Sequence, residues 1–426
     1  MRIDKVLLLS MSIWAAVALS VGLSSFVLKG FQAEVPKLPA YISGLLASST
    51  PIGMLIGAST CGLLGDRLGR KASLIVYIVL QIVGNILVSL AYDPVSFILF
   101  RLIAGIGAGG ILPIVSTLVA EFSLPRDRGS RIAFLESAWA YGWLLMVILA
   151  VTYFRTHGWR YYAIISSYAV TLLSIPALFI PESPRYLMSR GKIEEAKNLA
   201  SRYGIKLPEI PVIEKFGIKE GLKILLSKDH RRVTILLWIT WFAITMGYYG
   251  VFIWFPNLLA QHGMEIGFGA VSEFIRNNYY TYIVITTILQ IPGYYSAVYL
   301  VEKIGRIKTV SIYLIITGLA AFLLAFTTQP SLFLLAGMAL NFFDLGAWAA
   351  LYAYTPEQYP TQIRVLGSGW AAAWGRIGGI VGPYIVPFLG SWTTAFTFFA
   401  IINIVGGLAA LGGRELKGME MIELKK

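Results

Sequence analysis

The sequence predicts an all-α membrane protein in which twelve transmembrane helices form two pseudo-symmetric six-helix bundles. The first observation is composition: 57% of the 426 residues are apolar and only 13% are charged, whereas about a quarter of a soluble domain is charged. The second is that apolar runs of about 20 residues, long enough to span a bilayer, recur on both sides of one polar segment. The third is a charged turn at 62–71 whose pattern returns at 298–306.

Each predicted helix corresponds to one apolar run. The runs of the first half are 6–29, 41–64, 73–92, 95–120, 132–154 and 160–180. The runs of the second half are 233–261, 277–300, 309–328, 331–356, 365–388 and 391–413. The runs 95–120 and 331–356 are longer than a bilayer requires, so we expect these helices to tilt or to extend beyond the membrane.

The two halves repeat their charged residues at one offset. Three pairs share a separation of 236 residues: Asp66 with Glu302, Glu121 with Glu357, and Arg128 with Arg364. Each member follows an apolar run. Large internal repeats built from hydrophobic spans are typical of secondary transporters, so the pattern predicts a duplicated transport unit.

The basic residues predict the orientation. If the N-terminus is cytoplasmic, the inner segments hold 28 of the 35 Lys and Arg residues, the outer loops hold five, and two lie within spans. Inner loops of membrane proteins are enriched in Lys and Arg. The net charge of +13 is therefore a topological signal and does not indicate a nucleic-acid partner. We expect a multi-pass protein of the cell membrane, surrounded by the lipid bilayer, with both termini cytoplasmic.

These patterns predict four parts of the chain. Residues 1–180 form the N-terminal six-helix bundle, 181–232 a cytoplasmic linker, 233–413 the C-terminal six-helix bundle and 414–426 a cytoplasmic tail. Within the linker, 193–203 has apolar residues at helical spacing, which predicts a short amphipathic helix. We interpret the linker's basic residues as a solvated segment in preference to a lipid-binding one.

The sequence lacks the residue sets of enzymes and of ATP-driven pumps. The three histidines, at 157, 230 and 262, lie in predicted loops, and Cys61 is the single cysteine. No glycine-rich loop is followed by Lys and Ser or Thr. The glycines at 105, 107, 109 and 110 lie inside a predicted helix, where small residues allow close helix packing. We expect no enzyme activity, no cofactor and no metal site.

Four motifs resemble the major facilitator superfamily, over essentially the whole chain. They are the turn at 62–71, the helical motif from Arg101 to Gly110, Pro181-Glu-Ser-Pro-Arg-Tyr186, and the turn from Glu357 to Arg364. The third resembles the signature of sugar porters and their relatives. The stretches 135–143, 248–256 and 345–357 are similar to niacin and aromatic-acid carriers, synaptic-vesicle-glycoprotein-like proteins and organic cation/anion transporters. The paired glutamines of sugar porters are absent from 233–261, and 6–28 contains no acid.

Two ionisable residues, Asp344 and Arg376, are expected close to the middle of the bilayer. Such a residue costs about 2.5–3.5 kcal/mol on insertion scales, so it needs a partner or a purpose. One interpretation is a permanent ion pair that joins two helices. The other is that Arg376 binds a substrate carboxylate in a bidentate manner, while Asp344 competes for Arg376 and takes up a proton. The resemblance implies an anion as substrate, because related anion carriers place an arginine in the part of the chain that holds Arg376.

Two further ionisable residues lie within predicted spans of the first half. Glu136 is either a proton carrier or a partner of Arg128 or Arg131. Arg101 is expected at a different depth, so we do not pair it with Glu136. It resembles an arginine implicated in coupling within the superfamily, but the acid usually found in the first helix is missing here. A hydrogen-bonded arginine in the core is the alternative.

Aromatic residues are abundant near the middles of the predicted helices. We expect a subset to line a substrate site: Trp139, Tyr248, Tyr249 and Tyr352, together with Gln290. Asn341 lies one helical turn from Asp344 and is a further polar candidate. Other aromatic residues are expected to face lipid, the core or the membrane interfaces.

The repeated turns have a mechanical interpretation as conformational gates. Asp66, next to Arg67 and Arg70, can accept hydrogen bonds from helix N-terminal amides or from a facing arginine, which would latch the two halves together. Glu302 and Arg306 would do the same in the second half. Two further pairs extend the predicted network: Glu121 with Arg128, and Glu357 with Arg364. Individual surface pairs are weak, but a network remade between two states can bias an equilibrium.

The sequence therefore predicts a monomeric secondary transporter that moves a small organic anion, carboxylic and possibly aromatic in nature, together with a proton by alternating access. Three alternatives stay open at this point. They are a sugar or polyol porter, favoured by the 181–186 signature; a carrier of organic cations or drugs, with Asp344 as the cation site; and a ligand-binding sensor built on a transporter frame.

Overall fold

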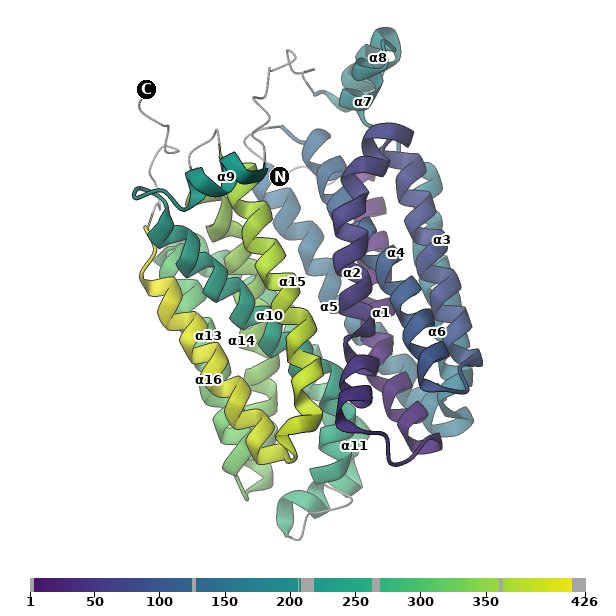
Figure 1. Cartoon of the computed structure of the whole chain (residues 1–426), viewed down its shortest axis with the longest axis vertical. Helices are drawn as coiled ribbons and strands as arrows, with labels where there is room; N and C mark the ends of the chain where they lie inside the picture. Colours follow the sequence, from purple (N-terminus) through teal and green to yellow (C-terminus); the bar gives the residue numbers. More distant parts are fainter. Residues whose placement is uncertain are drawn as a thin grey trace. The chain divides into compact units, whose positions relative to one another are not determined.

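The computed structural model describes residues 4–124, 128–205, 207, 218–262, 269–359 and 363–415, and nearly all of them are helical (Figure 1). Ten helical segments among these residues are long and apolar enough to cross a membrane. One of them, Gly129–Phe179, has 51 residues and contains two predicted spans, because its backbone turns at Gly158. A further helix, Arg364–Leu389, matches the predicted span 365–388. The predicted all-helical membrane fold is confirmed.

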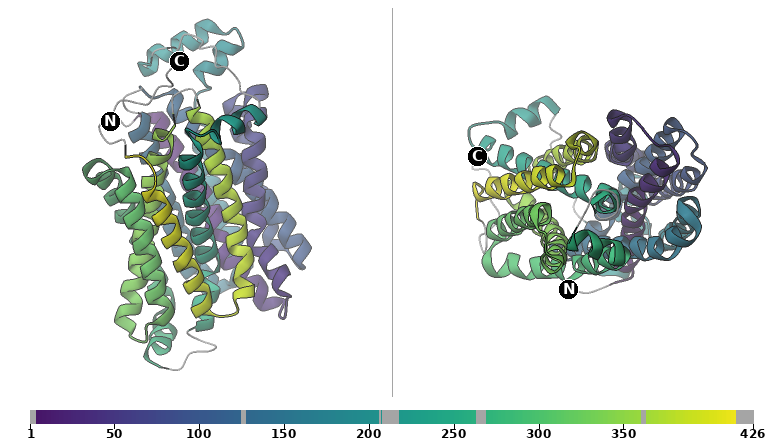
Figure 2. Two further views of the ribbon diagram at one scale, coloured as in Figure 1. Left: turned by 60° about the vertical axis from the view of Figure 1, so that its left-hand side comes forward. Right: turned by 90° about the horizontal axis from the view of Figure 1, so that it is seen from below.

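The helices form two compact units, Met1–Val27 with Ser49–Lys215, and Leu28–Ser48 with Phe216–Lys426. The helices of the first unit are α1 (Lys5–Glu34), α2 (Ala40–Leu68), α3 (Arg70–Leu87), η1 (Val88–Leu90), α4 (Pro94–Glu121), α5 (Arg128–Leu149), η3 (Ala150–Phe154), α6 (Arg155–Ser174), η4 (Ile175–Phe179), α7 (Pro184–Ser189) and α8 (Ile193–Tyr203). The last part of α1 and the first part of α2 belong to the second unit. Figure 2 shows the helices from the side and end-on.

Glycines set the packing of the first unit. A Cβ added at Gly105 or Gly109 of α4 would collide with the backbone of α2, and one added at Gly107 would collide with the backbone of α3. Glycine therefore lets α4 approach both neighbours closely, as small residues do between helices in lipid. This confirms the interpretation of 105–110 as a packing surface. The opposite face of α3 exposes Val76, Val79, Val83 and Ile86 at helical spacing, as expected for a lipid-facing surface.

The second unit contains eight helices among the described residues. They are α9 (Ile218–Leu225), α10 (Arg231–Ala260), α11 (Ala270–Ile288), α12 (Gln290–Ile304), α13 (Arg306–Phe326), α14 (Pro330–Glu357), α15 (Arg364–Leu389) and α16 (Trp392–Leu411). α14 packs against α10, α11, α12, α13 and α15, so it is central to this unit. In Figure 1, α9 and the end of α16 lie at the same end of the unit, as an even number of spans requires.

The predicted span 277–300 lies within one apolar segment, Ala270–Ile304, which consists of two helices. The apolar run 277–300 is divided between α11 and α12, which meet at Leu289, and Asn278 has non-helical backbone angles. The run length predicted one continuous helix, but a run of apolar residues does not report a local break. The interruption places Gln290 at the first position of α12, where its side chain is fully buried.

The short linker helix predicted at 193–203 is α8 (Ile193–Tyr203). Ala196 and Ala200 are buried, and the ring of Tyr203 contacts Phe122 with centroids 5.0 Å apart. Ile193 is 50% exposed, so the buried face of this helix is narrower than its apolar pattern predicted.

Candidate substrate and coupling sites

An aromatic cluster joins α10 to α14 in the second unit. The ring of Tyr248 lies 5.7 Å from that of Trp348, and the ring of Trp241 lies 5.2 Å from that of Tyr352 and 5.9 Å from that of Trp348. All three pairs are edge-to-face, which is a favourable geometry for aromatic rings. We call Trp241, Tyr248, Tyr249, Trp348 and Tyr352 the aromatic cluster.

The cluster follows from helical spacing. Trp241 and Tyr248 are seven residues apart on α10, and Trp348 and Tyr352 are four apart on α14, so each pair lies on one helix face. Tyr249 joins through Tyr248, with ring centroids 5.3 Å apart. The sequence predicted Tyr248, Tyr249 and Tyr352 as site residues. The sequence analysis did not predict Trp241 and Trp348 as site residues. Trp241 is seven residues from Tyr248 and Trp348 is four residues from Tyr352, and these helical spacings could have indicated them.

A strip of polar residues continues from the cluster along α14. The Gln290 amide of α12 donates to Asn341 Oδ1 at 2.9 Å, and the Asn341 amide donates to the carbonyl of Gly337 at 3.0 Å. Asp344 lies one turn further along α14 and Trp348 one turn beyond that. Gln290, Asn341 and Asp344 are at most 2% exposed. The sequence already placed Asn341 one turn from Asp344, and the structure adds Gln290 through its hydrogen bond to Asn341.

Three buried atoms of this strip have no hydrogen-bonding partner among the described residues: Asp344 Oδ2, Gln290 Oε1 and Trp348 Nε1. A buried polar atom without a hydrogen bond costs about 1–3 kcal/mol. Native proteins contain few such atoms, and each calls for an explanation. These three atoms are therefore available for hydrogen bonds to a ligand or to water.

Arg376 lies on α15, the helix packed along α10. A Cβ added at Gly375 would lie 3.0 Å from the Trp241 ring, and one added at Gly379 would lie 3.0 Å from the Tyr249 ring. Arg376, which follows Gly375, therefore lies on a helix that contacts the aromatic cluster. Arg376 is half-buried, as are Trp348 and Tyr352.

The ion pair between Asp344 and Arg376, one of the two interpretations of the sequence, is absent from the described part of the chain. The physical reason is the helix arrangement. α15 packs mainly along α10, whereas Asp344 lies on the face of α14 that carries Asn341 and Trp348. Two residues that are expected at the same depth in the membrane need not have side chains that face one another.

In the first unit, Arg101 is a fully buried arginine bonded to neutral acceptors. It donates to Thr50 Oγ1 at 3.1 Å, to Asn85 Oδ1 at 2.6 Å, to the carbonyl of Ser20 at 2.9 Å and to Ser24 Oγ. These groups come from α1, α2 and α3, so one side chain on α4 connects four helices. The hydrogen-bonded core arginine that the sequence left as an alternative is the arrangement found.

Replacing Arg101 with alanine is expected to lower the melting temperature of the purified protein by about 5 °C or more, because four buried acceptors lose their donor. Differential scanning fluorimetry in detergent measures this. The matched control is Arg202→Ala, which removes an exposed arginine of α8 and should leave the melting temperature unchanged. Equal melting temperatures for both variants would contradict the structural role of Arg101.

The remaining candidates of the first unit lie on α5. Glu136 is buried, and Trp139 stacks on Trp143 with centroids 6.3 Å apart. Arg131, one proposed partner of Glu136, forms an ion pair with Asp4 in which Nη1 and Oδ2 are 2.6 Å apart. The side chain of Arg128, the other proposed partner, lies outside the described residues. The proton-carrying role of Glu136 and the place of Trp139 in a substrate site stay predictions.

The two repeated turns use different acids from those predicted. Asp66, near the end of α2, pairs with Arg70, the first residue of α3, at 3.1 Å. Among the described residues, the first amides of α3 do not donate to Asp66. Those amides, of Arg70 and Lys71, donate to the carboxylate of Glu182 at 2.9 to 3.3 Å. A carboxylate at a helix N-terminus is stabilised by the unpaired N–H groups and the helix dipole. Of the two partners predicted for Asp66, the structure shows an arginine, Arg70, whereas the helix N-terminal amides donate to Glu182.

The second unit repeats this arrangement. The carboxylate of Glu415 accepts from the amides of Arg306 and Ile307, at 3.2 and 3.0 Å, at the start of α13. Arg306 also pairs with Glu302 at 3.0 Å and with Glu357 at 2.9 Å. Gly69 and Gly305, which precede the two helices, have φ of 95° and 103°, where glycine is favoured. Glu182 and Glu415 were not predicted, because no local pattern reports which distant acid reaches a helix end.

Other members of the predicted network have separate roles. Ser183 donates to the Glu121 carboxylate, and the carbonyl of Arg67 accepts from Arg190 at 2.7 Å. Arg67 itself is exposed. The side chains of Arg128 and Arg364 lie outside the described residues, so the predicted pairs with Glu121 and Glu357 stay predictions, as does the proposed gating.

Removing the carboxylate of Glu182 or Glu415 by substitution with alanine is expected to destabilise the protein by about 1 kcal/mol each, the usual value of a helix cap. Asp66→Ala should have a smaller effect, because the Asp66 side chain is 70% exposed and exposed pairs contribute little. Thermal unfolding of the three variants measures which of them loses most stability. A larger loss for Asp66→Ala than for Glu182→Ala would contradict the capping assignment.

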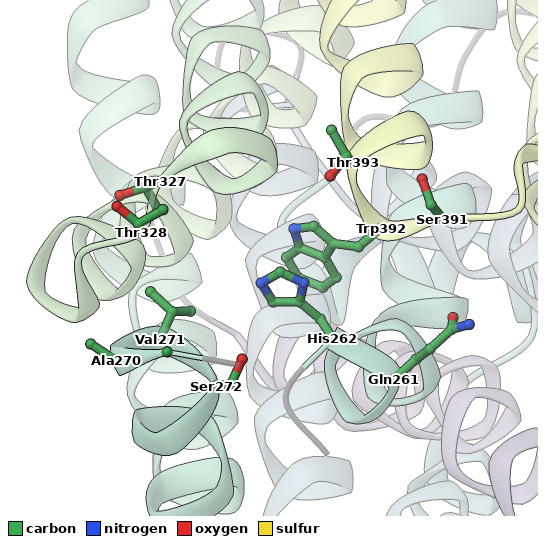
Figure 3. A pocket seen from close by; sticks show the side chains of 11 residues that line it. Gln261, His262, Ala270, Val271, Ser272, Thr327, Thr328, Ser391, Trp392 and Thr393 are labelled. Atoms are coloured by element: carbon green, nitrogen blue, oxygen red, sulfur yellow. The ribbon is translucent and has the colours of Figure 1, made fainter. Parts of the chain in front are cut away.

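A separate cavity of about 340 Å³ lies between the end of α10 and the starts of α11 and α16 (Figure 3). His262 lies against the ring of Trp392, with centroids 4.8 Å apart and planes at 19°. Burial lowers the pKa of His262, because desolvation disfavours its charged form. A neighbouring cavity of about 410 Å³, lined by Lys29, Trp254 and Asn257 among others, shares Gln261 with the first. The sequence predicted neither cavity.

The fold matches solved transporters. The inward-open xylose transporter XylE of E. coli aligns with a TM-score of 0.76 and 18% identity, over 97% of this chain and 96% of that chain. A crystal structure of a D-xylose-proton symporter aligns with a TM-score of 0.71 and 20% identity, over 96% of both chains. These matches confirm the major facilitator fold that the repeated motifs predicted. The class that the fold defines is thus a multi-pass helical membrane protein.

Within this class the chain belongs to the family described as "sugar (and other) transporter", whose profile matches residues 16–423. A Bacillus subtilis protein named as a niacin/nicotinamide transporter, NiaP, is 34% identical over 413 residues, 96% of this chain and 95% of that protein. The niacin transporter NiaP of Acinetobacter baylyi is 32% identical over 417 residues, 95% and 92% of the two chains. The synaptic vesicle 2-related protein of Xenopus laevis is 29% identical over 387 residues, 87% and 70%. The predicted branch is confirmed, and these relatives are transporters or transporter-like proteins rather than enzymes.

Proposed function

We propose that this chain moves a small aromatic carboxylate across the cell membrane together with a proton, by alternating access. It acts as a monomer with both termini cytoplasmic. The observation that carries the proposal is the aromatic cluster of α10 and α14, with the buried carboxyl group of Asp344 one turn from Trp348 and with Arg376 on the helix packed against the cluster. The names of the two NiaP relatives support niacin, pyridine-3-carboxylate, as the first substrate to test.

In this proposal the aromatic cluster holds the substrate ring. Trp348 and Tyr352 are half-buried, so each presents part of its ring for contact. An aromatic pair contributes about 0.5–1.5 kcal/mol beyond the area it buries. A flat heteroaromatic ring matches this lining better than a saturated ring does.

Arg376 is proposed to bind the carboxylate. Its planar guanidinium presents parallel N–H donors that match two carboxylate oxygens. The described residues offer Arg376 no acidic partner, so a bound anion would neutralise it. An organic cation would be repelled by this charge, which disfavours the cation-carrier alternative for the same site.

Asp344 is proposed to carry the proton. An ionised carboxyl group inside a membrane helix costs about 2.5–3.5 kcal/mol on insertion scales when nothing pairs with it, and no cation neutralises Asp344 among the described residues. Protonation removes this cost. A proton and an anion bound in the same unit make the loaded carrier electrically balanced, which favours its movement through the transport cycle.

The test is uptake and counterflow of labelled pyridine-3-carboxylate in liposomes that contain the purified protein. We expect saturable uptake that increases as the outside pH falls, and exchange that is blocked by unlabelled pyridine-3-carboxylate but not by xylose or tetraethylammonium. Competition by xylose alone would support a sugar porter, and competition by tetraethylammonium alone would support a cation carrier. Binding without counterflow would indicate a sensor, and each of these results overturns the proposal.

A further inference from the structure

The cavity of about 410 Å³ at the end of α10 is not used by the proposed binding of a carboxylate beside the aromatic cluster. Its described lining comes from the last turns of α1, α10 and α15 and from the residues between α15 and α16, and all of it belongs to the second unit. We call it the outer cavity, because α10 ends on the outer side in the predicted orientation. Ligand sites usually have volumes of about 300–1,000 Å³, so the outer cavity can hold a small organic molecule.

The cation in the described lining of the outer cavity is the ammonium group of Lys29. Its side chain is half-buried, and Nζ donates to the hydroxyl of Tyr279 at 2.7 Å. That hydroxyl donates in turn to the carbonyl of Pro256 at 2.8 Å. An ammonium group has three N–H donors, so Lys29 can bind Tyr279 and contact an anion at the same time. Glu34, the next acid along α1, is exposed and does not line the cavity.

Two amide side chains supply further donors to the outer cavity. Asn257 Nδ2 donates to Gln32 Oε1 at 2.6 Å, and this bond uses the oxygen of Gln32 but not its N–H groups. Gln261 lines the outer cavity and the neighbouring one (Figure 3), and its side chain forms no hydrogen bond to the described residues. The lining therefore offers a charged N–H donor and two neutral ones, which a carboxylate can accept.

The rest of the lining is mainly apolar. Trp254 donates its indole N–H to the carbonyl of Pro383 at 2.8 Å, so the surface that it presents to the cavity is carbon. Leu258, Val386 and Pro387 extend this apolar wall. A cation and amide donors beside an apolar wall suit a flat organic anion. An inorganic anion would leave the wall unused, and an organic cation would be repelled by the ammonium group.

We infer that the outer cavity is a second binding site for the aromatic carboxylate, separate from Arg376, which holds the anion before it enters the transport cycle. The inference rests on the proposed function for the class of ligand, but the two sites use different residues. A positive charge in a cleft with apolar walls raises the local concentration of an anion. Lys29 supplies this charge at the end of the second unit that faces the medium in the predicted orientation.

The test measures binding of pyridine-3-carboxylate to the full-length purified protein by isothermal titration calorimetry. We expect two classes of site in the wild-type protein, of which Arg376→Gln removes one. In the Arg376→Gln background, Lys29→Gln should weaken the remaining binding by about 10-fold or more, because a hydrogen bond to a charged group is lost. Lys29→Arg keeps the charge and should retain the site. Lys37→Gln removes an exposed lysine between α1 and α2 and should change binding by less than about twofold.

Gln261→Glu tests the outer cavity without removing the bond between Lys29 and Tyr279. It keeps the size of the side chain, breaks no hydrogen bond to the described residues and adds a negative charge to the lining. We expect it to weaken the outer site by about 10-fold or more. Gln329→Glu makes the same change at an exposed position before α14 and should have no effect.

The outcomes separate the inference from the proposed function. A single class of site that Arg376→Gln removes overturns the inference and leaves the proposed function intact. Residual binding that ignores both Lys29→Gln and Gln261→Glu also overturns it. Binding that Lys29→Gln and Gln261→Glu weaken, but that Arg376→Gln leaves unchanged, supports the outer site and contradicts the proposed role of Arg376. If the wild-type protein does not bind pyridine-3-carboxylate, both proposals fail.

Discussion

Arg376→Ala is expected to abolish uptake of pyridine-3-carboxylate, with a loss of on the order of 100-fold in affinity or more. Removing one partner of a desolvated, hydrogen-bonded charge pair costs about 2–5 kcal/mol. Arg376 is the charged residue carried within α15 where this helix lies against the aromatic cluster. Uptake into liposomes measures the loss of transport, and calorimetry measures the loss of affinity.

Two further variants separate charge from geometry at this position. Arg376→Lys keeps the charge but loses the planar fork, so we expect intermediate affinity. Arg276→Ala removes an exposed arginine of α11 and should transport normally. If Arg376→Ala inserts correctly and still takes up the carboxylate with normal affinity, the assignment of Arg376 is wrong and the anion must be bound elsewhere.

Asp344→Asn is expected to flatten the pH dependence of carboxylate uptake between about pH 5 and 8 and to abolish accumulation against a gradient. In the wild-type protein, uptake should rise as the outside pH falls, because the loaded carrier needs a proton on Asp344. Asparagine resembles the protonated carboxyl group and cannot release a proton. Counterflow, which needs no net proton movement, should continue. A pH titration of both activities in liposomes distinguishes the two effects.

The surroundings of Asp344 favour this assignment. Tyr248 of α10, Tyr282 of α11 and Tyr313 of α13 contact the α14 rings of Trp348, Phe333 and Phe343. The charged pair between α13 and α14, Arg306 with Glu357, lies at the far end of α14, thirteen residues from Asp344. Tyrosines have an ordinary pKa near 10, so they stay neutral in this range. α15 contributes Arg376, and Gln290 of α12 does not titrate.

Glu136→Gln is the comparison that decides between the two candidate proton carriers. If Asp344 carries the proton, Glu136→Gln should keep the wild-type pH profile, and so should Glu273→Gln, which changes an exposed acid of α11. An unchanged profile in Asp344→Asn, together with a flat profile in Glu136→Gln, would move the coupling to the first unit.

Much of the fold could be predicted from the sequence because a bilayer imposes a length on apolar helices. Runs of about 20 residues must span the hydrocarbon core and satisfy their backbone hydrogen bonds internally, so composition alone indicates where each helix lies. The glycines of α4 were equally informative, since small residues at helical spacing mark a close helix contact. The division of the run 277–300 into α11 and α12 could not be predicted, because apolar composition does not encode a local break.

Less of the candidate site could be predicted. Tyr248, Tyr249, Tyr352, Gln290, Asn341 and Asp344 were identified from residue type and depth, and the structure places them together in one unit. The addition of Trp241 and Trp348, and the absence of an ion pair between Asp344 and Arg376 among the described residues, depend on which helix faces which. The same holds for Glu182 and Glu415, which reach the starts of α3 and α13 from more than 100 residues away.

The sequence by itself determined that this protein is a duplicated helical bundle in a membrane. It also identified the ionisable residues within the predicted spans, whose charge is unfavourable in lipid. Those features follow from local rules, namely the length of an apolar run, the spacing of side chains on a helix and the cost of a charge in lipid. The tertiary structure alone decided which of these residues meet. Hydrogen bonds and ring contacts extend only a few ångströms, and the rotation of each helix about its axis, set by packing against its neighbours, determines which side chains come within that reach.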